Sequence, residues 1–206
     1  MLYTTHSFRY ADVILQQPEF AADSAELLGM IQGVTDADLV EQHNAYARDG
    51  LRIPKSLSVA INQILKDRFR QHGWALESPI FQDAEYQDNR WRLDFAKGTI
   101  SVEVAFNHAG SIAWNMIKPV LASELNHVRK AIQTKIGVII TATNAMRDAG
   151  GFDGAIGTFE TFQNYLKPFN GILTTPMLII GLLPPTTFRI EQHRVNGKML
   201  GEVVML

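Results

Sequence analysis

Apolar residues in the first third of the chain recur at helical spacing. Three short helices are expected within residues 1–50, at about 8–15, 27–31 and 36–48. Thr35 followed by acidic residues is typical of the N-cap of the third helix. A stronger helix is expected from Ser56, as its cap, to Gly73, because its apolar residues follow each other at spacings of three and four. The N-terminal part is therefore predicted to be helical.

The pattern changes to strict alternation between residues 90 and 107. Apolar and polar residues alternate from Ile100 to Asn107, which is the period of a strand with one buried face. Leu93 and Phe95 indicate a second, shorter strand, and the Lys97-Gly98 pair between the two strands suits a tight turn. The sequence therefore predicts a β-hairpin here.

Helices and buried strands are expected to alternate over the rest of the chain. The predicted elements are a helix at 112–130 interrupted by Pro119, a strand at 135–143, a glycine-rich loop at 145–157, a helix at 158–167, a strand at 176–183, and a C-terminal hairpin at 186–206 with an Asn196-Gly197 turn. This order predicts a single α/β domain over residues 1–206, with a central mixed sheet flanked by helices.

Composition narrows the class of protein. The 206 residues carry 19 Lys and Arg against 21 Asp and Glu, so the net charge of -2 gives no indication of a nucleic-acid partner. A local cleft can still be positive on such a protein. Cysteine is absent, which excludes disulfides and thiol nucleophiles and favours the cytoplasm. The longest apolar run, 177–183, is too short to cross a bilayer, so no membrane partner is expected.

The hairpin carries the clearest candidate chemistry. A two-residue turn at Lys97-Gly98 would set Asp94 opposite Ser101 and Arg92 opposite Glu103, whereas a three-residue turn would alter this register. With the two-residue turn, Asp94 and Glu103 would be diagonal neighbours on the polar face, about 7 Å apart at Cβ. Two carboxylates with a backbone carbonyl between them suit Mg²⁺, which prefers oxygen ligands. An Arg92–Glu103 ion pair on a solvated face explains the same pattern without any function.

Segments 60–74 and 93–107 resemble type II restriction endonucleases of the BglII and BstYI kind, in the PD-(D/E)xK nuclease superfamily. LDFAKGTISVEVAFN is similar to their D-x8-E-V-Q-F segment, and AINQILKDRFRQHGW to the helix that precedes it. KIGVIITAT, the glycine-rich loop, TFETFQNYL and TPMLIIGLLPP follow in the family's order. The resemblance covers roughly residues 55–185, which become the expected catalytic core of a restriction-endonuclease-like fold.

The resemblance implies a homodimer that uses Mg²⁺ to cut palindromic double-stranded DNA with a GATC core, leaving 5′ overhangs. It also implies a cognate methyltransferase in the same host. Asp94 and Glu103 would be metal ligands, with the Val104 carbonyl as a third. Asn62 or Gln63 matches the position that adds a polar group beside the scissile phosphate.

One position departs from the family pattern. The superfamily places Lys, and the BglII kind Gln, two residues after the Glu, where this chain has Ala105. Asn107 on the same face is a candidate substitute. Otherwise the metal-bound water needs no side chain, or the protein binds DNA without cutting it. A repair or recombination nuclease of the same superfamily is a further alternative.

Candidate DNA contacts come from basic residues, among them Lys118 on the helix after the hairpin, and from two loops. Each basic candidate can also be an ordinary surface charge. In the glycine-rich stretch the acidic residues and Thr158 can accept from or reach base edges, or can simply cap the following helix. The expected contacts are Arg92, Lys97, Asn107, His108, Ser111, Arg147, Asp153, Thr158 and Glu160.

Overall fold

A six-stranded mixed sheet forms the centre of the molecule in the computed structural model, which describes residues 1–124 and 128–206. The strand order is β1-β6-β5-β4-β3-β2. Its strands are β1 (Tyr3–Phe8), β2 (Ala75–Pro79), β3 (Arg92–Lys97), β4 (Ile100–Val104), β5 (Ile136–Ala142) and β6 (Met177–Leu182). β4, β5 and β6 run parallel, and the other neighbours pair antiparallel. The predicted α/β class with a mixed sheet is confirmed.

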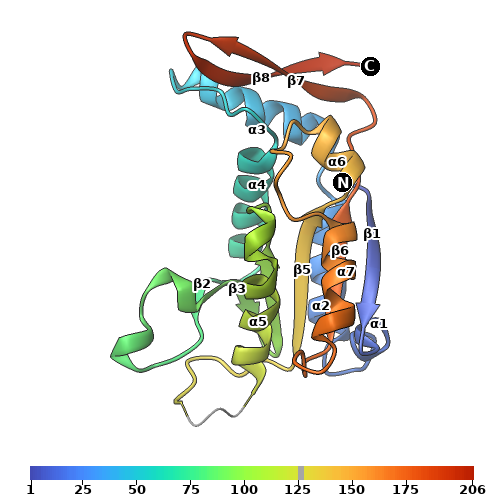
Figure 1. Cartoon of the computed structure of the whole chain (residues 1–206), viewed down its shortest axis with the longest axis vertical. Coiled ribbons are helices and arrows are strands. Elements are labelled where there is room, and N and C mark those ends of the chain that lie inside the picture. Colours follow the sequence, from blue (N-terminus) through green and yellow to red (C-terminus); the bar gives the residue numbers. More distant parts are fainter. Residues whose placement is uncertain (125–127) are drawn as a thin grey trace.

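Helices cover both faces of this sheet (Figure 1). They are α1 (Ala11–Ile14), α2 (Ala21–Gln32), α3 (Asp36–Arg48), α4 (Ser58–Gln71), α5 (Ile112–Ser123), α6 (Asn144–Ala149) and α7 (Phe159–Phe169). Alternate residues of β5 enter two apolar clusters. Val138 packs in the cluster that contains Leu27 of α2 and Ile61 of α4, whereas Ile139 packs in the cluster that contains Met116 of α5 and Phe162 of α7. Burial on both faces explains why β5 and β6 read as continuous apolar runs.

The N-terminal part corrects the prediction of an all-helical segment. Residues 3–8 form β1, which pairs antiparallel with β6 along its whole length, from Tyr3 opposite Leu182 to Phe8 opposite Met177. The alternation in this segment is weak because β1 is an edge strand with only one neighbour. The third helix does begin at Thr35, whose hydroxyl accepts from the Asp38 amide in a capping box.

Four further features differ from the sequence prediction. The helix that begins at Ile112 ends at Ser123, and residues 125–127 of its expected continuation lie outside the described residues. The first half of the expected glycine-rich loop is the short helix α6, capped by Thr143. β2 was not predicted, because ALESP shows no period-two alternation. Ser56 stands just outside α4, whose N-cap is Leu57.

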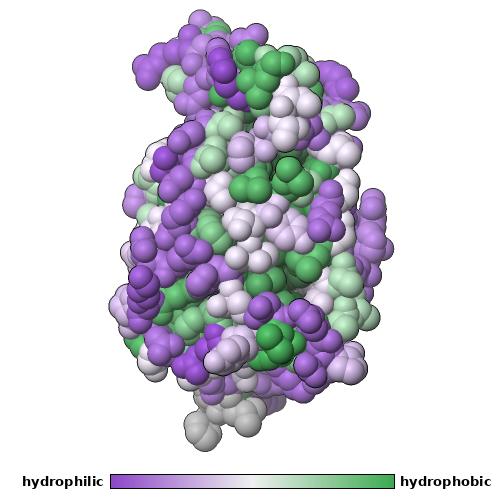
Figure 2. Space-filling view, turned by 90° about the vertical axis from the view of Figure 1, so that its right-hand side faces the viewer, coloured by the Kyte–Doolittle hydropathy of each residue, from purple (hydrophilic) through white to green (hydrophobic). Residues whose placement is uncertain are grey.

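The C-terminal hairpin of β7 (Phe188–Val195) and β8 (Lys198–Met205) is confirmed as a separate two-stranded sheet. Asn196 and Gly197 have φ of 49° and 79°, the values of the expected type I′ turn. The buried His43 of α3 lies 2.9 Å from the Gly201 carbonyl oxygen. The hairpin thus sits on α3 as a lobe above the main body (Figure 2). Among the described residues no helix combines the length and apolarity needed to cross a bilayer.

Candidate active site

The turn between β3 and β4 fixes which residues face each other. Lys97 pairs with Ile100 and Phe95 with Val102, so the turn consists of Gly98 and Thr99. Gly98 has φ of 54°, a conformation that glycine adopts without strain at the first position of a primed turn. Continuing the register by one pair sets Asp94 across from Glu103. The expected Lys97-Gly98 turn is therefore wrong by two residues in register, and Arg92 does not pair with Glu103.

An even shift preserves the faces of the strands, so both carboxylates still point to the same side of the hairpin. That side is not solvated as the sequence suggested, because α5 packs over it. Glu103 is only 1% exposed and forms an ion pair with Lys118 of α5. Asp94 Oδ2 accepts a 2.7 Å hydrogen bond from the Val104 amide. The two acids thus stand on neighbouring strands, Glu103 paired with a lysine of α5 and Asp94 bonded to a backbone amide of β4.

Burial and mutual repulsion both act on this pair. Burial raises the pKa of Asp94, while the charge of Lys118 and the Val104 amide act in the opposite direction. Burial and the neighbouring charge of Asp94 raise the pKa of Glu103 well above its usual range, and Lys118 again opposes the shift. Two buried carboxylates side by side favour either a shared proton or a cation.

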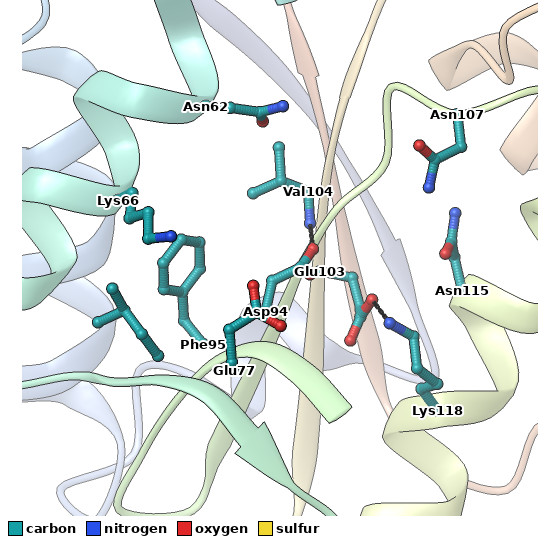
Figure 3. A pocket seen from close by; sticks show the side chains of 11 residues that line it. Asn62, Lys66, Glu77, Asp94, Phe95, Glu103, Val104, Asn107, Asn115 and Lys118 are labelled. Atoms are coloured by element: carbon teal, nitrogen blue, oxygen red, sulfur yellow. Dashed lines mark hydrogen bonds and ion pairs between the residues drawn. The ribbon is translucent and has the colours of Figure 1, made fainter. Parts of the chain in front are cut away.

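Both carboxylates line a pocket of about 300 Å³ (Figure 3). Asn62 and Lys66 reach it from α4, whereas Asn115 and Lys118 reach it from α5. The lining is Asn62, Lys66, Leu76, Glu77, Asp94, Phe95, Glu103, Val104, Asn107, Asn115 and Lys118. The pocket therefore offers three carboxylates, two ammonium groups and three amides to one bound group.

The residues present fit a divalent cation. Glu103 Oε1 is buried and has no hydrogen-bond partner among the described residues. A buried carboxylate oxygen of this kind is suited to coordinate a cation. Asp94 lies beside it, and Val104 follows Glu103 on the lining of the same pocket. In the part of the chain that the structure describes, no group of three or more His, Cys, Asp or Glu is arranged to hold a metal. A cation here would thus depend on two acids and a backbone oxygen, with water completing its shell.

Of the other predicted catalytic residues, some line the pocket and one does not. Asn62 and Asn107 line the pocket together with the carboxylates. Gln63 lies outside its lining, and its amide donates to Asp67 at 2.8 Å. Of the two alternatives on this helix, the structure brings only Asn62 to the acids.

Two predicted DNA contacts are engaged with protein groups. Arg92 donates to the carbonyl oxygens of Glu77 and Gln87 at 3.0 and 3.2 Å. Lys97 pairs with Glu26 at 2.7 Å and with Asp23 at 3.4 Å, which ties the hairpin to α2. Both side chains have structural partners in this conformation.

The loop candidates lie beside the pocket strand. His108 forms a β-bridge with Ile156, and the Gly157 amide donates to the Asn107 carbonyl oxygen at 3.0 Å. His108 and Asp153 are exposed, and Asp153 pairs with Lys55 at 2.9 Å. The structure therefore brings the two candidate loops, 107–111 and 150–157, to one edge of the sheet.

The remaining candidates have local partners. Arg147 belongs to α6 rather than to a loop and pairs with Asp148 at 2.8 Å. Glu160 accepts from the Asn144 amide at 3.0 Å. Thr158 is 1% exposed and its hydroxyl lies 3.0 Å from that of Thr161, so it is not available to a base edge here. Ser111 is the N-cap residue of α5, and its amide donates to the His108 carbonyl oxygen at 2.8 Å.

Sequence reasoning missed Asn115 as a site residue, and it named Lys118 only as one of the basic residues that could contact phosphate, not as a partner of the carboxylates. The apolar stripe of the helix that carries both residues indicates a helix packed on the core. A signal was present, because the two polar residues are three apart and therefore share one face of the helix. Lys66 gave a comparable signal, since it stands four residues after Asn62.

The central mixed sheet flanked by helices, with paired carboxylates on β3 and β4, defines the nuclease fold of restriction endonucleases. The family model described as restriction endonuclease BglII/BglIII matches residues 3–182, and the chain belongs to this family. Membership places it among the type II site-specific deoxyribonucleases, which generally use a divalent metal ion. The match begins at residue 3, so the N-terminal part, which the sequence resemblance left out, also belongs to the family.

Two solved structures are similar over 100% of both chains. Restriction endonuclease BglII complexed with a DNA 16-mer has 17% sequence identity and a TM-score of 0.66. Free BglII has 18% identity and a TM-score of 0.56. At this identity the likeness supports the fold. No curated protein sequence matched the chain.

Proposed function

We propose that the protein is a Mg²⁺-dependent restriction endonuclease that cleaves palindromic double-stranded DNA with a GATC core and leaves 5′ overhangs. It acts in the cytoplasm as a homodimer, because a palindrome presents two identical half-sites. A cognate methyltransferase protects the DNA of the same host. The observation that carries the proposal is the paired Asp94 and Glu103 in a pocket of a BglII-family fold.

Asp94, Glu103 and the Val104 carbonyl would hold Mg²⁺. The unpartnered Glu103 Oε1 supports this assignment, because a buried carboxylate oxygen needs a donor or a cation. Bound Mg²⁺ polarises a phosphoryl oxygen and lowers the pKa of a water molecule. Asn62 and Asn107 reach the same pocket and would donate to phosphate oxygens.

The DNA-facing edge consists of the two neighbouring loops at 107–111 and 150–157. His108 and Asp153 are exposed there, and the backbone of Gly154 is open to close approach because an added Cβ would meet nothing within 4 Å. The ion pairs of Asp153 with Lys55 and of Arg147 with Asp148 would open on DNA binding. Ion pairs at the protein surface contribute little to stability, because water and salt screen them.

Cleavage of unmethylated phage-sized DNA in the presence of Mg²⁺ tests the proposal. The wild-type protein is expected to give discrete fragments, and the Asp94→Ala variant none. Mapping the fragment ends then identifies the recognition sequence and the overhang. An absence of both cleavage and binding to GATC-containing duplexes would overturn the proposal.

A second candidate is a DNA-binding protein of the same fold that no longer cuts. Its supporting observation is Ala105, whose methyl group can neither position nor activate water. Binding to GATC duplexes without any cleavage by the wild-type protein would favour this candidate over the first. Preference for a DNA structure over a sequence, measured by competition, would instead identify a repair or recombination nuclease.

A further inference from the structure

Ala105 is packed directly beneath α5, where only a small side chain fits. Its side chain is 2% exposed and belongs to the same apolar cluster as Ile112 and Met116, both on α5. A longer polar side chain at this position would have to enter that cluster. The position that elsewhere in the superfamily supplies a functional group is used here to seat α5.

The same helix delivers a cation to the site. Lys118 stands two residues beyond Met116, is 8% exposed, and forms its ion pair with Glu103 at the edge of the pocket. Its ammonium also donates to the Arg92 carbonyl oxygen at 3.1 Å. Figure 3 shows the side chain pointing from α5 toward the carboxylates. A lysine this buried is held by its partners, so its position in the pocket is fixed.

We propose that Lys118 is the catalytic ammonium of this enzyme, supplied from α5 in place of the side chain that Ala105 lacks. The inference rests on the proposed nuclease function. A phosphate that enters the pocket meets Lys118 beside Asp94 and Glu103, because all three line it. The ammonium of Lys118 then donates to that phosphate and offsets the charge that develops during attack.

The proposed role leaves the reaction balanced. The oxygen of a water molecule bonds to phosphorus, the bond from phosphorus to the leaving ester oxygen breaks, and that oxygen takes a proton from solvent. The proton lost by the water goes to solvent. Lys118 keeps its own protons throughout and contributes charge and hydrogen bonds only.

A structural role for the same lysine predicts a different outcome, because Lys118 and a cation compete for Glu103. The ion pair occupies Oε2 of Glu103 and leaves Oε1 open. Replacing the ammonium by a neutral donor would therefore leave cation binding equal or tighter. Loss of a purely structural contact would weaken both cation binding and cleavage.

The test compares Lys118→Gln and Lys118→Arg with the wild-type protein. Glutamine keeps a donor for Glu103, so the variant is expected to fold, with a melting temperature close to that of the wild type. Its single-turnover cleavage in Mg²⁺ is expected to fall by about 10²-fold or more. Its affinity for Ca²⁺, measured on the DNA-free protein by calorimetry, is expected to be unchanged or higher. Arginine keeps the charge and is expected to restore part of the cleavage rate.

Two further variants are matched controls. Lys135→Gln removes an exposed lysine that pairs with Glu19 outside the pocket and is expected to cleave at the wild-type rate. Lys66→Gln removes the other lysine of the pocket. Full cleavage by Lys118→Gln, or a loss confined to Lys66→Gln, would overturn the assignment of Lys118. Absence of cleavage by the wild-type protein would instead overturn the proposed function itself, so the two failures are distinguishable.

Discussion

Asp94 Oδ2 accepts a hydrogen bond of 2.7 Å from the backbone amide of Val104. This bond joins the first carboxylate of the site to the residue that follows the second, Glu103. Because the bond fixes the side chain of Asp94, it also fixes the position of the second carboxylate oxygen, Oδ1. The two acids are therefore set relative to each other by backbone geometry as well as by packing.

The Asp94→Asn variant separates the charge of Asp94 from its hydrogen bond. Asparagine still offers a side-chain oxygen to the Val104 amide, so the melting temperature is expected to stay close to that of the wild type. The lost negative charge is expected to reduce cleavage by about 10²-fold or more. Measuring both quantities on one preparation checks this expectation, and wild-type cleavage by the variant would contradict the role of Asp94.

Ala105→Gln reinstates the residue of the BglII kind at a position that has no room for it. The side chain would enter the apolar cluster beneath α5, and overpacking is expected to lower the free energy of unfolding by about 1–3 kcal/mol. Cleavage is not expected to rise. Urea unfolding and single-turnover cleavage measure the two effects. Ala145→Gln, at an exposed position of α6, is the matched control and should leave both unchanged.

The raised pKa values of Asp94 and Glu103 make the metal-free protein sensitive to pH. The folded state holds protons on these acids more tightly than the unfolded chain does. Their contribution to stability is therefore complete below the usual carboxyl range of about 4 and is lost as the pH rises through the raised values. The melting temperature of the metal-free wild type is expected to fall with pH relative to that of the Asp94→Asn/Glu103→Gln double variant.

Added Ca²⁺ should reverse this loss, and more strongly at higher pH, because the cation competes with protons for the carboxylates. The double variant provides the control, since it should gain little stability from Ca²⁺ at any pH. An equal gain in both proteins would place the bound cation elsewhere.

The contribution of His43 to stability is expected to depend on pH with the opposite sign, at the other end of the molecule. Burial lowers its pKa, and its Nε2 lies 2.9 Å from the Gly201 carbonyl oxygen of β8. The neutral ring is thus favoured in the folded state, so its stabilisation is present above pH of about 6.5 and is lost as the pH falls below that value. The protection of β8 amides from hydrogen exchange, measured relative to the intrinsic exchange rate at each pH, is expected to decrease at mildly acidic pH. The His43→Gln variant should show no such pH dependence.

The sequence predicted the parts of this fold that follow one period and missed those that depend on distant partners. β5 and β6 were found because burial on both faces demands continuous apolar runs. β1 is not predicted, because this edge strand is defined by its pairing with β6, about which residues 3–8 carry no local signal.

The candidate site shows the same division. Asp94 and Glu103 were predicted on one face because side chains alternate along a strand, although the turn was placed one residue early. The pairing of Lys118 with Glu103 could not be predicted, since the two residues are fifteen apart in sequence and only the packing of α5 on β4 brings them together. Periodicity thus identifies faces, and tertiary packing decides what meets across them.

The position of β1 has a consequence for how the protein is made. A ribosome produces residues 3–8 long before residues 177–182, yet these two segments must pair along six positions. Contacts so far apart in the chain form slowly, because a long loop must close before they contribute to stability. During synthesis β1 therefore waits as an unpaired strand, and the nascent chain completes its sheet only after Leu182 has left the exit tunnel.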